Sequence, residues 1–116
     1  MSNLVLGPVI GKLGGGAEVH NIPVDFVSSS GRGVKHVVDV PVPVGVTARV
    51  IVVGASAGMA SSVSYWPRLI IGGQDIGRYH GSVGGSATVT GPTVVEVNQI
   101  GYNPSFVGTV YWWAED

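Results

Sequence analysis

Short runs of β-branched residues, each ended by glycine, proline, asparagine or serine, fill this chain almost from end to end. Valine dominates the runs, which recur at intervals of about ten residues. β-Branched side chains favour extended backbone, and short strands with turn residues at this spacing are typical of a sandwich or a barrel. No stretch of about ten residues shows the helical period of 3.6. We therefore expect an all-β protein in which any helix is a single turn.

The pattern predicts nine strands. They cover Val5–Ile10, Ala17–Val27, Val34–Val40, Ala48–Val53, Val63–Ile71, Gln74–Tyr79, Ala87–Thr90, Thr93–Ile100 and Phe106–Trp113. We expect a single antiparallel β-sandwich over residues 1–116, jelly-roll-like, with eight or nine short strands. Residues 1–16 can form an extended, Gly-rich N-terminal arm.

The connections carry specific turn residues. Gly72–Gly73 predicts a two-residue hairpin, because both positions of such a turn need positive φ. Two prolines in Val40–Val44 remove ladder donors, so we expect a corner between sheets or an edge there. Gly91–Pro92 and Asn103–Pro104 predict turns or loops.

Charge is scarce. Of the 116 residues 45% are hydrophobic and 11% are charged, against about 25% charged in typical domains. Disordered chains have few hydrophobic and many charged residues, so this composition excludes a disordered chain. The net charge of −1 offers no general attraction to nucleic acid or to an anionic membrane. The chain has no cysteine, which excludes disulfides and thiolate zinc sites.

The N-terminal residues have no basic segment followed by a sustained apolar one. We therefore expect no signal peptide, and synthesis and folding in a cytoplasm. The longest apolar runs, such as Val50–Val53, have about four residues. A membrane-spanning helix needs about 20.

One catalytic motif is present in outline. Gly54–Gly58 matches the G-x-S-x-G nucleophile elbow around Ser56, and Asp75 and His80 follow in the order of a triad. An elbow needs a helix behind the serine, whereas residues 61–67 favour a strand and end in proline. The same glycines lack the helix that a dinucleotide-binding turn requires. We expect a small-residue loop here and no enzymatic activity, with a serine hydrolase built on Ser56 as a remote alternative.

Metal and cofactor sites have no support in the spacing of residues. His20, His36 and His80 are scattered, although Asp25 or Asp39 could join one of the first two in a sheet. The acids show no calcium-loop pattern. A carboxylate pair for glycoside hydrolysis can be drawn from almost any acids and is not a signal. We expect no metal and no cofactor.

Aromatic residues beside hydrogen-bonding groups indicate where a ligand could bind. An aromatic ring can stack on the apolar face of a sugar or on a protein partner. We expect any such site in loops at one end of the sandwich, with candidates Gln74, Asp75, Arg78, Tyr79, His80, Tyr102 and Asn103.

The final strand predicts an oligomer contact. Tyr111, Trp112 and Trp113 are consecutive, and strand side chains alternate between faces, so at least one of these rings leaves the core. Few charges are available to cover a monomer surface, and exposed apolar patches favour association. We expect a homo-oligomer, most simply a trimer, with these residues at the interface.

Several features together resemble one class of protein. They are the cysteine-free Gly/Val/Ser-rich composition, the glycine-punctuated start Gly7–Gly16 and the Gly-x-Val-Tyr-Trp-Trp strand Gly108–Trp113. The chain resembles small virion accessory proteins of tailed bacteriophages, such as head decoration proteins, head fibres and tail-fibre tips. This resemblance implies a jelly-roll-like, often trimeric structural protein that contacts other virion proteins. More loosely, the chain is similar to small trimeric lectin sandwiches, which implies carbohydrate binding, for example to a host-surface glycan, as the alternative.

Overall fold

A computed structural model describes residues 9–12, 18–27, 33–59, 67–79 and 81–115. These ranges contain eight strands and no helix. The strands are β1 (Val9–Lys12), β2 (Glu18–Val27), β3 (Gly33–Val40), β4 (Thr47–Met59), β5 (Arg68–Ile71), β6 (Gln74–Arg78), β7 (Ser82–Thr90) and β8 (Thr93–Ala114). The prediction of an all-β protein is confirmed.

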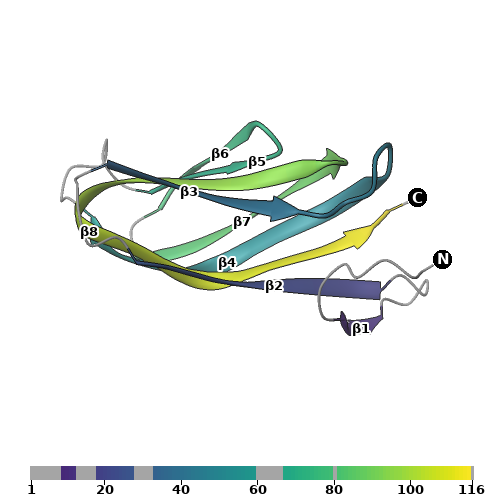
Figure 1. The fold of residues 1–116 in the computed structure, drawn as a ribbon, viewed down its shortest axis with the longest axis horizontal. Helices are drawn as coiled ribbons and strands as arrows, with labels where there is room; N and C mark the ends of the chain where they lie inside the picture. Colours follow the sequence, from purple (N-terminus) through teal and green to yellow (C-terminus); the bar gives the residue numbers. More distant parts are fainter. Residues whose placement is uncertain (1–8, 13–17, 28–32, 60–66, 80, 116) are drawn as a thin grey trace.

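The strands form two antiparallel sheets that face each other (Figure 1). Sheet A has the order β1-β2-β8-β4-β7 and sheet B the order β3-β8-β5-β6. The chain crosses between the sheets after β2, β3, β4, β6 and β7. This order, with β8 supplying one strand to each sheet, is that of the jelly roll. The predicted sandwich is confirmed.

The expectation of short strands is wrong for β8. Its 22 residues run through sheet B, bend, and continue in sheet A (Figure 1). The sequence predicted two strands with a turn at Asn103–Pro104, but the backbone stays extended there. At the bend, the side chains that point toward the core change from odd-numbered to even-numbered positions. Thr93, Val95 and Val97 are buried in the first half, whereas the even-numbered Phe106, Val110 and Trp112 are buried in the second.

Other strand ends differ from expectation because pairing extends them. β4 and β7 pair with each other from Thr47–Thr90 to Ala55–Ser82, so each strand is longer than its β-branched run. Within the arm expected at residues 1–16, Val9–Lys12 forms β1 on the edge of β2. The rest of that arm, and most of the strand predicted over Val63–Ile71, lies outside the described residues.

Three predicted connections are confirmed. Gly72 and Gly73 close the β5–β6 hairpin with φ of 56° and 81°. Residues 41–46 carry the chain from β3 in sheet B to β4 in sheet A without forming a strand. Gly91–Pro92 joins β7 in sheet A to β8 in sheet B.

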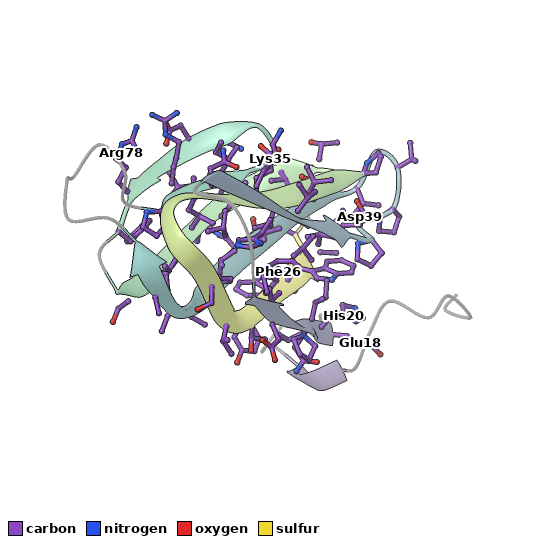
Figure 2. The ribbon with its side chains drawn as sticks, turned by 60° about the vertical axis from the view of Figure 1, so that its left-hand side comes forward. Glu18, His20, Phe26, Lys35, Asp39 and Arg78 are labelled. Atoms are coloured by element: carbon purple, nitrogen blue, oxygen red, sulfur yellow. The ribbon has the colours of Figure 1, made fainter. Side chains whose placement is uncertain are left out.

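The core lies between the sheets and is built mainly from valine, with Trp112 and Phe106 as its largest fully buried side chains. Two histidines are also buried, each stacked on an aromatic ring. His20 lies on Trp112 with ring centroids 4.5 Å apart. His36 of sheet B lies on Phe26 of sheet A at 4.6 Å, a contact that joins the sheets. Figure 2 shows His20 and Phe26 on β2.

Candidate functional site: an end pocket and the outer face of sheet A

The predicted ligand residues on β6 have separate environments. Gln74 lies at the hairpin end of the strand, and Arg78 at its other end, opposite Arg68. Asp75 forms an ion pair with Arg68, with Arg68 Nε and Asp75 Oδ2 3.5 Å apart. Tyr79, just after β6, packs against the core. The structure therefore does not gather these four residues around one point.

The remaining predicted ligand residues lie at or near segments that are not described in full. His80 is outside the described residues. Tyr102 and Asn103 belong to the backbone of β8, at its bend between the sheets. Their side chains are likewise outside the described part of the chain.

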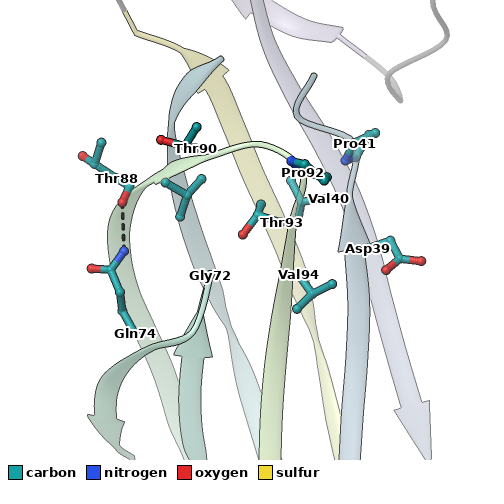
Figure 3. A pocket seen from close by; sticks show the side chains of 11 residues that line it. Asp39, Val40, Pro41, Gly72, Gln74, Thr88, Thr90, Pro92, Thr93 and Val94 are labelled. Atoms are coloured by element: carbon teal, nitrogen blue, oxygen red, sulfur yellow. Dashed lines mark hydrogen bonds between the residues drawn. The ribbon is translucent and has the colours of Figure 1, made fainter. Parts of the chain in front are cut away.

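A pocket of about 640 Å³ opens where β3, the β5–β6 hairpin and the β7–β8 connection meet (Figure 3). It is lined by Asp39, Val40, Pro41, Gly72, Gln74, Thr88, Val89, Thr90, Pro92, Thr93 and Val94. Of the predicted ligand residues, Gln74 alone is in this lining, and its Nε2 donates to the Thr88 carbonyl at 2.9 Å. Among the described residues, the lining contains no lysine, no arginine and no aromatic ring.

The pocket is suited to neutral groups rather than to anions. In the described part of the chain, its one ionisable lining side chain is that of the exposed Asp39 on β3, across the pocket from the exposed Thr88 and Thr90 on β7 (Figure 3). The hydroxyl of Thr93 is buried beneath Gly72 and has no hydrogen-bond partner among the described residues. Sequence reasoning missed this site because its threonines and prolines have no distinctive spacing.

Ser56 does not lie on a nucleophile elbow. The expected small-residue loop at Gly54–Gly58 is instead part of β4, paired with β8. Ser56 is buried, and its hydroxyl donates to the carbonyl of Gly81 at 3.2 Å. Asp75, the acid of the supposed triad, pairs with Arg68 in sheet B. The described residues of the motif therefore have the geometry of a strand and not of a strand-to-helix turn.

The aromatic residues of β8 divide between the two faces of sheet A. Trp112 is 1% exposed and stacks on His20 in the core, so its predicted place at an oligomer interface is wrong. Tyr111 and Trp113 point away from the core and are half-buried. The two tryptophans lie on opposite faces because, in this half of β8, the even-numbered side chains point toward the core.

Tyr111 and Trp113 belong to a broad surface that we call the outer face of sheet A. It includes these residues, which β2, β8, β4 and β7 direct away from the core: Asn21, Pro23, Asp25, Val107, Thr109, Tyr111, Trp113, Thr47, Arg49, Ile51, Val53, Ala55, Ala57, Ser82, Gly84, Ser86, Thr88 and Thr90. Two of these are charged, Asp25 and Arg49. Arg49 Nε lies 4.0 Å from a carboxylate oxygen of Glu115.

The middle of this face is uncharged, and its β4 side chains are apolar. Val53 lies opposite Thr109, and Ile51 opposite Tyr111, in the β4–β8 pairing. Val53 and Val107 are 42% and 52% exposed. With strands about 4.8 Å apart and about 3.3 Å per residue, four strands of ten residues present about 600 Å². This area is that of the whole outer face. It is somewhat smaller than the area of about 800 Å² that each partner contributes to a standard protein interface.

Metal-binding and membrane-spanning features are not found in the described residues. No group of three or more His, Cys, Asp or Glu side chains is placed to hold a metal ion in that part of the chain. No helix among the same residues is long and apolar enough to cross a membrane.

Comparisons with protein-family models, curated proteins and solved structures gave no match.

Proposed function

We propose that this chain is a structural protein without catalytic activity, which assembles with copies of itself through the outer face of sheet A. The apolar centre of that face carries the proposal. Val53 and Val107 are exposed there and Ile51 is half-buried, in a jelly roll whose sequence offers 13 charged residues in all. Exposed apolar patches of several hundred Å² mark interaction surfaces.

A second copy explains this face better than a charged partner does. Asp25 and Arg49 lie toward its margins, and Arg49 is close to Glu115 of its own chain. The face therefore has no excess of either sign with which to select an acidic or basic partner. Tyr111 and Trp113 supply aromatic side chains of the kind enriched among interface residues that dominate binding energy.

This assembly is consistent with the resemblance to accessory proteins of bacteriophage virions, and we propose that role. Small jelly-roll proteins are common among viral capsid and lectin domains. The lectin-like alternative depended on aromatic rings beside polar groups, and the end pocket has none in its lining. Particles purified from infected cells should contain the chain as a structural component, detectable by mass spectrometry. Its absence from such particles would remove the virion role and leave self-assembly standing.

Two valines of similar exposure test the interface. Val53 is 42% exposed on the outer face of sheet A, and Val37 is 45% exposed on the opposite side of the molecule, on β3. A lysine at position 53 must lose its hydration when the face is covered, which is costly. We expect Val53→Lys to lower the native mass measured by multi-angle light scattering, and Val37→Lys to leave it unchanged. The proposal fails if the native chain is a monomer at 100 μM or if Val53→Lys keeps the native mass.

A further inference from the structure

Among the described residues four strands lie at sheet edges, and three of them have features that disfavour pairing with another strand. β1 has four residues and an irregular register with β2. β3 exposes Lys35 and Asp39 (Figure 2). β6 has five residues, among them Asp75 and Arg78, and its register with β5 is shifted. Short length, charge and bulges are the means by which natural sheets avoid edge-to-edge association.

The fourth edge strand, β7, has none of these features. Its nine residues, Ser82–Thr90, include no charged residue and no proline. They pair with β4 without any shift of register. β7 is therefore a long, uncharged and regular edge, which is the kind that accepts a further strand.

The hydrogen bonds next to β7 show which of its residues face the free edge. Ser56 N–H donates to the Gly81 carbonyl, and Gly91 N–H donates to the Val46 carbonyl, so the odd-numbered positions bond toward β4. In an antiparallel strand the direction alternates with each residue. The even-numbered residues of β7 consequently direct their N–H and C=O groups away from β4. The Thr88 carbonyl does so, because it accepts from Gln74 Nε2.

We propose that β7 pairs with β7 of a second copy, so that sheet A continues through two molecules related by a two-fold axis. The strand is self-complementary when the axis passes through Ser86. Val83 then lies opposite the partner's Val89, and Gly84 opposite the partner's Thr88. The five residues whose backbone groups point away from β4, Ser82, Gly84, Ser86, Thr88 and Thr90, meet one another in hydrogen-bonded pairs. The exposed side chains in these pairs are small and uncharged, so none of them repels its counterpart.

The fold favours a second copy over a foreign peptide at this edge. A two-fold contact closes on itself and leaves no open end. It also makes the outer face of sheet A continuous across two molecules, while using backbone groups that face-to-face packing does not use. This contact goes beyond the proposed function, and it favours an even number of copies instead of a trimer. Gln74 must release the Thr88 carbonyl when the second strand adds.

The pairing is tested first by native mass. Ser86→Pro removes an N–H that faces the free edge and leaves the β4 ladder intact, a position where sheets tolerate proline. Ser86→Ala keeps that N–H and is the matched control. By light scattering, we expect Ser86→Pro to have half the native mass and Ser86→Ala to have the native mass, with the same circular dichroism. A folded Ser86→Pro variant of native mass would overturn the proposal.

Cysteine cross-linking tests the register and does not depend on the proline variant. The chain has no cysteine of its own. Ser86→Cys should form a disulfide-linked dimer on mild oxidation, because residue 86 lies opposite itself. Ser82→Cys should cross-link only when it is mixed with Thr90→Cys. Efficient cross-linking of Ser82→Cys by itself, or none with Ser86→Cys, would contradict the pairing. Val53→Lys should leave these disulfides unchanged, so a failure of this inference is distinguishable from a failure of the proposed function.

Discussion

Gly54 and Gly108 are the residues whose small size the central strands need most. They lie opposite each other in the β4–β8 pairing, on the side of sheet A that faces the core. A Cβ built on Gly54 would lie 2.5 Å from the Val107 carbonyl oxygen and 2.9 Å from the Phe106 ring. The pair therefore gives Phe106 the space in which it is buried.

We expect Gly54→Ala to lower the free energy of unfolding by about 1–3 kcal/mol, the usual cost of overpacking a core. Gly84→Ala is the matched control on β7, because a Cβ there would have no atom within 4 Å. Its effect should stay within about 0.5 kcal/mol. Urea unfolding of both variants measures the difference, at a concentration low enough to keep the chain monomeric so that the contacts proposed for Gly84 do not contribute. Equal stability of the two variants would show that β4 and β8 can move apart to admit the methyl group.

Among the elements, β8 connects the two sheets. It lies between β3 and β5 in sheet B and between β2 and β4 in sheet A. Opening either sheet beside β8 therefore exposes part of the common core. Central strands commonly exchange their amide hydrogens only when the whole domain unfolds.

We expect native-state hydrogen exchange to give the same, highest opening free energy for the amides of Val95 and Val97 in sheet B and of Val110 and Trp112 in sheet A. Edge strands β1 and β6 should exchange sooner, because each pairs on one side only among the described residues. Exchange of the sheet B half of β8 at a clearly lower free energy than the sheet A half would show that the sheets open independently.

For the whole molecule, self-association couples assembly to stability. A partner that binds only the folded state stabilises it by mass action. If the outer face of sheet A and the β7 edge are covered by copies, the thermal midpoint should rise as the concentration is raised 100-fold, from about 1 to 100 μM. Scanning calorimetry or circular dichroism measures this shift. A constant midpoint would mean that folding and association are not linked, contrary to both proposals.

Local residue preferences were enough to predict the class of fold and much of its local structure. Runs of β-branched residues and the turn residues between them predicted β2, β3 and β6 almost to the residue, the Gly72–Gly73 hairpin and the corner at Val40–Val44. These features depend on local preferences: β-branched side chains favour extended backbone, and positive φ favours glycine. Strand alternation also showed that Trp112 and Trp113 must lie on opposite faces.

Which face of each strand points toward the core follows from the packing of the two sheets and not from local preferences. Alternation says that two side chains share a face, but only the packing of sheet B over sheet A puts Trp112 in the core and Trp113 outside. Pairing with β8 likewise kept Gly54–Gly58 extended, although its composition favours a loop. The end pocket and the free β7 edge arise from strands distant in sequence. Such contacts depend on the order of strands in the sheets, which local residue preferences do not specify.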